Sequence, residues 1–130
     1  MSNVDTARTA YDAFNSGDME TLREMFTEDA EWVTSDELPQ GGTTNGRDAI
    51  MENFGELPNY WSEFRVDPEQ FIDGGDDVVI AGTQSATGEG GSFEARFLHL
   101  MHFEDGKVAR GEFITDSAKA VTALGSKAAA

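Results

Sequence analysis

The feature that most constrains the fold of this chain is a change in its hydrophobic period after residue 62. From residue 63 to residue 115, apolar and polar side chains alternate, a pattern typical of β-strands that bury one face. Turns rich in Gly, Asp and Glu interrupt the alternation at residues 74–77, 88–91 and 104–106. We therefore predict an antiparallel meander of four strands, at 63–73, 77–87, 92–104 and 107–115.

The residues before this point follow a helical period instead. Apolar side chains at three- and four-residue steps predict a helix that stops at Asn15-Ser16-Gly17. A second helix follows, capped by Asp18 and burying Met19, Leu22, Met25 and Phe26, and a third begins at Gly46 and ends at Pro58. Between them, 27–35 predicts a short strand and 36–46 a loop. Residues 118–124 predict a closing helix.

Helices followed by an antiparallel meander indicate an α+β fold. At 130 residues the chain is long enough for one core and one ligand-sized cavity. We assign residues 1–125 to a single domain and 126–130 to a frayed C-terminal tail.

Composition excludes several kinds of partner and chemistry. The formal charge of −16 would repel a phosphate backbone or an anionic membrane, so we expect neither nucleic acid nor membrane as a partner. The chain has no cysteine, which excludes disulfides and thiolate chemistry. No leader or membrane-length apolar run is visible, and we expect a cytoplasmic protein. The evenly spread acidity suggests a surface adapted to high salt; an ordinary acidic protein is the alternative.

Two histidines lie three residues apart in the third predicted strand. Because successive strand residues point to opposite faces, Phe97, His99, Met101 and Phe103 share one face and His102 lies on the other. A metal pair would need a bulge between the two histidines, so we predict no metal site.

The next strand places Ala109, Gly111, Phe113 and Thr115 on one face, where Gly111 leaves space. Large apolar residues around a missing side chain suggest a pocket that contains His99. The alternative is a core histidine whose nitrogens are satisfied by the backbone or a buried water.

Five phrases in order resemble the SnoaL-like, ketosteroid-isomerase-related branch of the NTF2-like superfamily, and the resemblance spans about residues 4 to 124. They are "AYDAFNSGDMETLREMFTEDAEWV" (10–33), "LPQGGTTNGRDAI" (38–50), "FRVDPEQFIDGGDDVVIAG" (64–82), "TGE" (87–89) and "FLHLMHFEDGKVARGEFITDS" (97–117). The resemblance implies a cone in which a curved sheet wraps around helices and encloses an apolar cavity. It also implies a homodimer through the outer face of the sheet, where Leu98, Leu100 and Ile114 would lie.

The resemblance allows the family's chemistries to be checked by position. The acidic donor of ketosteroid isomerase, an enzyme that serves as a general example of pKa tuning, maps onto His99. Its tyrosine and base map onto Ala10 and Thr34, although Tyr11 or Asp36 is close enough in sequence to substitute. Steroid isomerisation by that mechanism is therefore not expected. The residues that limonene-epoxide hydrolases need map onto Thr83, Ser85 and Phe113, which excludes that activity.

The comparison leaves His99 as the titratable group in the implied cavity, with two candidate roles for Asp116: a partner of His99, or the N-cap of the closing helix. The implied ligand-binding residues are aromatic or flexible apolar side chains: Tyr11, Trp32, Phe54, Trp61, Phe97, Met101 and Phe113. Two functions stay open. One is a cofactor-free isomerase or cyclase that moves a proton on a polyketide- or steroid-like carbonyl compound through His99. The other is a non-catalytic binding or carrier protein for a small hydrophobic molecule.

Overall fold

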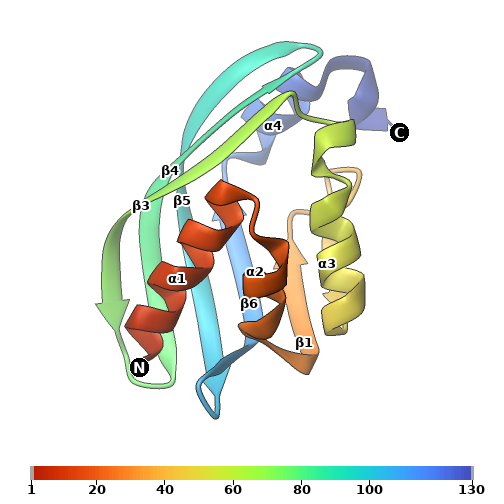
Figure 1. Cartoon of the computed structure of the whole chain (residues 1–130). Coiled ribbons are helices and arrows are strands. Elements are labelled where there is room, and N and C mark those ends of the chain that lie inside the picture. The colour runs from red at the N-terminus through yellow and green to blue at the C-terminus, as the bar shows by residue number, and fades with distance from the viewer. Residues whose placement is uncertain (1, 130) are drawn as a thin grey trace.

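The computed structural model describes residues 2–129, which form a six-stranded sheet with three helices in the first half of the chain, two before the first strand and one after the second (Figure 1). The helices are α1 (Asn3–Ser16), α2 (Met19–Glu24) and α3 (Arg47–Gly55), and the 3-10 turn η1 (Leu57–Asn59) follows α3. A last helix, α4 (Ser117–Leu124), and the 3-10 segment η2 (Gly125–Ala129) end the described chain.

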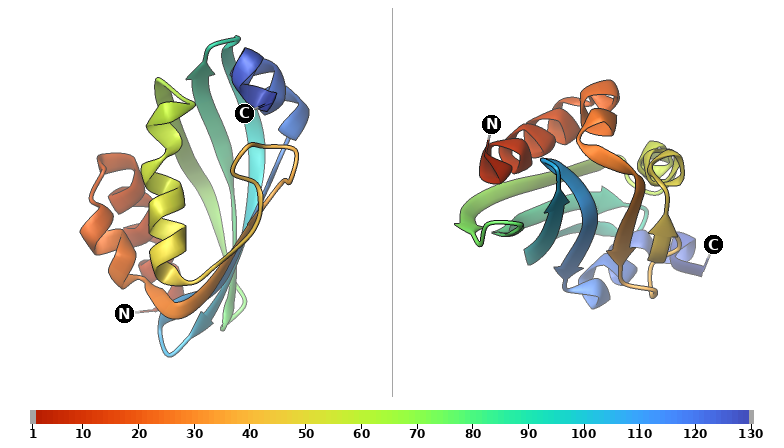
Figure 2. Two further views of the ribbon diagram at one scale, coloured as in Figure 1. Left: turned by 90° about the vertical axis from the view of Figure 1, so that its right-hand side faces the viewer. Right: turned by 90° about the horizontal axis from the view of Figure 1, so that it is seen from below.

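The sheet contains β1 (Phe26–Thr34), β2 (Gly42–Asn45), β3 (Glu63–Asp73), β4 (Asp77–Gly88), β5 (Gly91–Glu104) and β6 (Lys107–Thr115). Their spatial order is β2-β1-β6-β5-β4-β3, and β1 runs parallel to β6 while the other neighbours are antiparallel. The sheet is strongly curved, and α1, α2 and α3 lie together on one side of it (Figure 2). The predicted α+β cone is confirmed.

The predicted helix boundaries follow from side-chain caps. Ser2 accepts from the Asp5 amide while the Asp5 carboxylate accepts from the Ser2 amide, a capping box that fixes the start of α1. Gly17 ends α1 in the left-handed region, at φ 78°. Asp18 then caps α2 by accepting from the Thr21 amide. Helix α2 is shorter than predicted, because Phe26 already begins β1, where it remains buried.

Two segments differ from the sequence-based expectation. The predicted loop 36–46 contains β2, which pairs with β1 from Glu31↔Asn45 to Thr34↔Gly42. The predicted frayed tail forms η2 over Gly125–Ala129, where Lys127 Nζ donates to the Asn59 carbonyl at 3.0 Å. Residue 130 of that tail lies outside the described residues.

A β-bulge in the β5–β6 pair changes which residues of β6 face the helices. His102 pairs with Arg110 and Phe103 pairs with Val108, so Ala109 is the extra residue. Val108, expected on the outer face, is fully buried as a result. Beyond the bulge the predicted alternation holds, since Gly111 is buried and Ile114 is exposed.

Two apolar clusters fill the concave side of the sheet. The larger joins α1, α3 and the sheet, and the smaller joins Trp61, Ala86 and three residues of α4. Phe64 contacts both clusters, and the space between them is the site described below. None of the helices in the described residues is long and apolar enough to cross a membrane.

Candidate functional site

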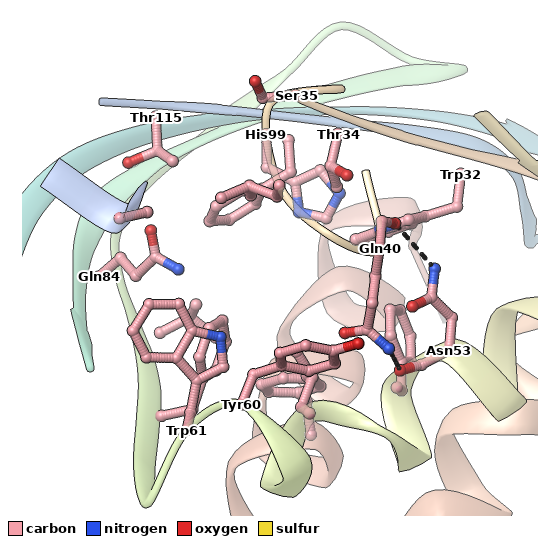
Figure 3. A pocket seen from close by; sticks show the side chains of 18 of the residues that line it. Trp32, Thr34, Ser35, Gln40, Asn53, Tyr60, Trp61, Gln84, His99 and Thr115 are labelled. Carbon is pink, nitrogen blue, oxygen red and sulfur yellow. Dashed lines mark hydrogen bonds between the residues drawn. The ribbon is translucent and has the colours of Figure 1, made fainter. Parts of the chain in front are cut away.

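A cavity of about 150 Å³ lies between the helices and the concave face of the sheet. Six of the seven predicted ligand-binding residues line it: Tyr11, Trp32, Phe54, Trp61, Met101 and Phe113. Helix α1, strand β1, helix α3 and strands β5 and β6 therefore all contribute to the wall. Figure 3 shows the ring of His99 projecting from the sheet into this space.

Phe97, the seventh predicted ligand-binding residue, is not in the lining. Its ring is stacked between those of Tyr11 and Phe113, with centroids 6.1 and 4.9 Å away. It lies across the backbone of Gly82, where an added Cβ would come within 2.7 Å of the Phe97 ring. Phe97 therefore supports the wall from behind, in a place that Gly82 keeps open.

The centre of the site is a hydrogen bond between Tyr11 and His99. Helix α1 directs the Tyr11 hydroxyl to Nδ1 of His99 at 2.7 Å, and the two residues are only 5% and 3% exposed. Burial raises the pKa of Tyr11, so the phenol keeps its proton. The phenol has no other acceptor among the hydrogen bonds of the described residues, so it donates to Nδ1. This assigns the mobile proton of the neutral imidazole to Nε2.

Burial also decides the charge of His99. Its pKa falls to about 3 because the imidazolium would lose its hydration in the apolar interior. The negative charge of the molecule acts in the other direction, and burial is the larger effect. His99 is therefore neutral at neutral pH and presents an N–H donor.

Nε2 of His99 is buried and has no hydrogen-bond partner. It lies over Gly111 together with the six-membered ring of Trp32: a Cβ on Gly111 would be 3.1 Å from Nε2 and 2.7 Å from Trp32 Cζ3. The Trp32 and His99 rings meet edge to face, with centroids 4.9 Å apart. The space that Gly111 leaves is therefore filled by Trp32, whose ring closes off Nε2.

Asp116 and His102 lie away from this pair. Asp116 is exposed and accepts from the Lys119 amide at 3.3 Å as the N-cap of α4, so the geometry gives it the capping role and not a contact with His99. His102 is 43% exposed on the opposite face of β5, where its Nδ1 is 2.9 Å from the Asp77 carboxylate. The prediction that the two histidines face opposite ways is confirmed.

Sequence reasoning missed Gln84, a buried polar residue of the cavity wall. It is 5% exposed, and its Oε1 has no hydrogen-bond partner. The signal was present in the alternation of β4, where the other side chains of the buried face, Val78, Ile80 and Ala86, are apolar. A glutamine at such a position is a buried amide that needs an explanation.

Polar side chains also gather at the rim between β2 and α3 (Figure 3). Asn53 Nδ2 donates to the Gln40 carbonyl at 3.3 Å, and Gln40 Nε2 donates to the Glu56 carboxylate at 2.9 Å. Gln40 Nε2 also donates to the Asn53 carbonyl at 3.2 Å, and these bonds hold the loop before β2 against α3.

The described residues that line the cavity include no Asp, Glu, Lys or Arg. Within the described part of the chain, no group of three or more His, Asp and Glu residues is placed to hold a metal ion. The lining combines aromatic faces with side-chain hydroxyls, amides and the neutral imidazole of His99.

Comparisons with known proteins agree with this fold. The SnoaL-like domain family matches residues 7–111. No curated protein matches the chain.

Several solved structures are similar over nearly the whole chain. An NTF2-like protein of unknown function from Burkholderia pseudomallei K96243 is 29% identical, with a TM-score of 0.90, and the match covers 97% of this chain and 100% of that one. TerC, solved with polyporic acid, is 30% identical, with a TM-score of 0.88 and coverage of 95% and 98%. A proposed SnoaL-like polyketide cyclase from Jannaschia sp. CCS1 is 18% identical, with a TM-score of 0.81 and coverage of 95% and 92%, and shows the fold alone. The family match spans most of the chain and the architecture is that of NTF2-like proteins, so this chain belongs to the SnoaL-like domain family.

Proposed function

We propose that this SnoaL-like protein binds a small hydrophobic carbonyl compound in its cavity and promotes an isomerase- or cyclase-type proton transfer within that compound, without a cofactor. The observation that carries the proposal is the buried Tyr11–His99 pair, which leaves one imidazole N–H without a partner at an apolar cavity. A buried donor without a partner is costly, and a ligand oxygen would satisfy it.

His99 would act as a hydrogen-bond donor and not as a base. Its Nδ1 lone pair is occupied by the Tyr11 hydroxyl, and its Nε2 carries the proton. When a solvent water takes the proton from the carbon beside the carbonyl, negative charge develops on the oxygen, and a fixed donor in an apolar site stabilises that charge until water returns a proton to the ligand. Tyr11 keeps the imidazole oriented through this change.

Trp32 must move for a ligand oxygen to reach Nε2. Its ring lies beside Nε2 over Gly111 and is only partly buried. Rotation of this one side chain would expose the imidazole edge and present an aromatic face to a flat ligand. The bound state is therefore expected to differ from the free state mainly at Trp32.

The second candidate function is binding or carriage without chemistry. The specific observation in its favour is the uncharged lining, because a proton transfer needs an acceptor and the described wall offers no carboxylate or amine. Under this candidate, His99 would hold the oxygen of the ligand and nothing would react.

The two functions separate in an exchange experiment with 1-tetralone, a bicyclic aromatic ketone, followed by proton NMR in D₂O. As an enzyme, the protein should accelerate exchange of the protons beside the carbonyl. His99→Phe should reduce that acceleration by about 10²-fold, the usual effect of removing one donor to a developing oxyanion. As a carrier, the protein should bind the ketone and leave the exchange rate unchanged.

His102→Phe is the matched control, because it removes an exposed histidine on the other face of β5. If His99→Phe folds poorly, the double variant with Tyr11→Phe and His99→Phe replaces it. The double variant removes both polar partners and leaves no buried hydroxyl without a partner. Polyporic acid, with which TerC was co-crystallised, is the second ligand to titrate. Binding of neither compound, with no exchange, would contradict both candidate functions.

A further inference from the structure

Gln84 is a buried amide that the Tyr11–His99 pair does not explain. It lies on β4, on the face that Val78, Ile80 and Ala86 bury, and it lines the same cavity as His99. Its side-chain oxygen is inaccessible to solvent and accepts no hydrogen bond from the described residues. A buried amide oxygen without a partner is unfavourable, so a role toward a ligand accounts for it better than a structural role does.

The chemistry of a carboxamide indicates which ligand group would satisfy it. An amide presents an acceptor oxygen and a donor NH₂ group, and a hydroxyl is the small group that bonds well to both, since it donates and accepts. A ketone or ether oxygen can only accept and would leave the Gln84 oxygen without a donor. The amide therefore favours a ligand hydroxyl.

The strand register separates this amide from the imidazole. Ile80 is opposite His99 in the β4–β5 pair, whereas Gln84 is opposite Ala95. Four residues along a strand correspond to about 13 Å between Cα positions, so the two polar groups are well apart on one wall. Figure 3 shows both side chains directed into the cavity, with Trp61 below Gln84. An elongated ligand of two or three fused rings would contact both groups.

We propose that Gln84 determines ligand specificity: the cavity selects an elongated apolar compound whose carbonyl oxygen accepts from His99 and whose hydroxyl, at the opposite end, bonds to the Gln84 amide. This inference rests on the proposed function, since it takes the carbonyl position from His99. It names the substrate class as hydroxylated fused-ring ketones.

Three bicyclic ketones that differ at one position test the inference by calorimetric titration. They are 1-tetralone, which has the carbonyl alone; 6-hydroxy-1-tetralone, which adds the hydroxyl opposite it; and 6-methoxy-1-tetralone, which adds an oxygen that cannot donate. The wild-type protein should bind the hydroxy compound about tenfold more tightly than the methoxy compound, as one good hydrogen bond allows. In Gln84→Met this ratio should fall close to one.

Gln70→Met is the matched control, because Gln70 is exposed on β3 and outside the cavity, and it should keep the wild-type ratio. Gln84→Met should melt at or above the wild-type temperature without ligand, since the substitution removes an unpartnered buried amide. A clear loss of thermal stability would assign the amide to the fold and overturn the inference.

Equal binding of the hydroxy and methoxy compounds by the wild type, or a preference that survives in Gln84→Met, would also overturn it. The effect of His99→Phe on 1-tetralone is measured separately, because that ketone has no hydroxyl for Gln84. If Gln84→Met leaves the affinity ratio unchanged while His99→Phe still affects 1-tetralone, this inference fails and the proposed function stands. If His99→Phe does not change the behaviour of 1-tetralone while Gln84→Met still abolishes the preference for the hydroxy compound, Gln84 remains the determinant of hydroxyl binding and the proposed carbonyl contact with His99 is wrong.

Discussion

At the scale of single residues, the two nitrogens of His99 have different environments. Nδ1 is held by a buried phenol 2.7 Å away, and Nε2 lies against Trp32 and Gly111 with no polar partner. The first contact fixes the tautomer, and the burial that accompanies it removes the charge. The loss of charge comes from the apolar surroundings, and it should be visible in the response of the protein to pH.

The neutral His99 should make stability fall on acidification. The imidazole pKa is about 3 in the folded protein and near 6.5 in the unfolded chain, so the unfolded chain binds a proton first as the pH falls. The stability that depends on a neutral His99 is fully present above pH 6.5 and is lost progressively as the pH falls from 6.5 to 3. From pH 6.5 to pH 5 the loss is about 2 kcal/mol, measured by urea unfolding at each pH.

His99→Phe supplies the comparison, because the carboxylates that also titrate in this range are common to both proteins. As the pH falls, the unfolding free energy of the wild type should decrease more than that of the variant. Parallel stability curves for the two proteins would show that His99 is not buried in the neutral form.

At the scale of elements, the alternation of apolar residues was sufficient for β3 to β6, whose observed ends lie within about a residue of the predicted ones. It was insufficient for β2, because the four residues Gly42–Asn45 have no apolar pattern of their own and form a strand only by pairing with β1. The bulge at Ala109 was also out of reach, since it depends on how β6 meets β5. Local pattern predicts an element, whereas its partners decide its register.

The same distinction applies to the site. His99 and most of the aromatic wall were predicted, because alternation and helical spacing assign a residue to a face. The Tyr11–His99 bond was not, since it joins residues 88 positions apart through the docking of α1 on the sheet. Nothing local separated the cavity wall from the layer behind it, so Phe97 was placed one layer too far forward.

The contact between β1 and β6 yields a second prediction, at Gly111. Trp32 and Gly111 are paired residues of these parallel strands, and the Trp32 ring covers the glycine. In Gly111→Ala the new methyl group would meet Trp32 at 2.7 Å and His99 Nε2 at 3.1 Å, so both rings must shift. We expect a loss of about 1 to 3 kcal/mol in unfolding free energy, as for other overpacked cores.

Ligand affinity should fall with stability in Gly111→Ala, because the displaced rings are the ones that form the site. Gly55→Ala is a suitable control: Gly55 ends α3, and an added methyl group meets nothing within 4 Å. An unchanged unfolding free energy in Gly111→Ala would show that Trp32 has room to move aside at little cost, and would favour the mobile Trp32 that ligand entry requires.

At the scale of the whole molecule, the outer face of the sheet combines exposed apolar side chains with arginines that are paired to carboxylates. Ile72, Leu98, Leu100 and Ile114 are 49%, 50%, 37% and 52% exposed. Arg96 pairs with Glu69, and Arg110 Nε donates to Glu31 at 3.0 Å on the same sheet. We propose that this face, whose exposed apolar side chains have no cover among the described residues, binds a second copy of the protein.

Leu98 and Ile114 are cross-strand partners near the middle of that face. Changing both to Gln should weaken a dimer by about tenfold or more, because central apolar contacts dominate such interfaces. Light scattering after gel filtration, in dilute buffer and in 1 M KCl, would measure this. Salt should favour the wild-type dimer, since the screening length falls to about 3 Å at 1 M. A wild-type monomer under both conditions would contradict the proposal.

The parallel pairing of β1 with β6 also affects how the chain folds. Glu31 and Arg110, joined by a hydrogen bond across this pair, are 79 residues apart, so the chain must close a long loop before these strands can meet. Contacts of such long range slow folding. During synthesis, Trp32 leaves the ribosome long before Gly111 exists, and its ring has no glycine to cover. The cavity beside Trp32 should therefore be among the last parts of the nascent protein to form, after the hairpins of β3, β4 and β5 have closed locally.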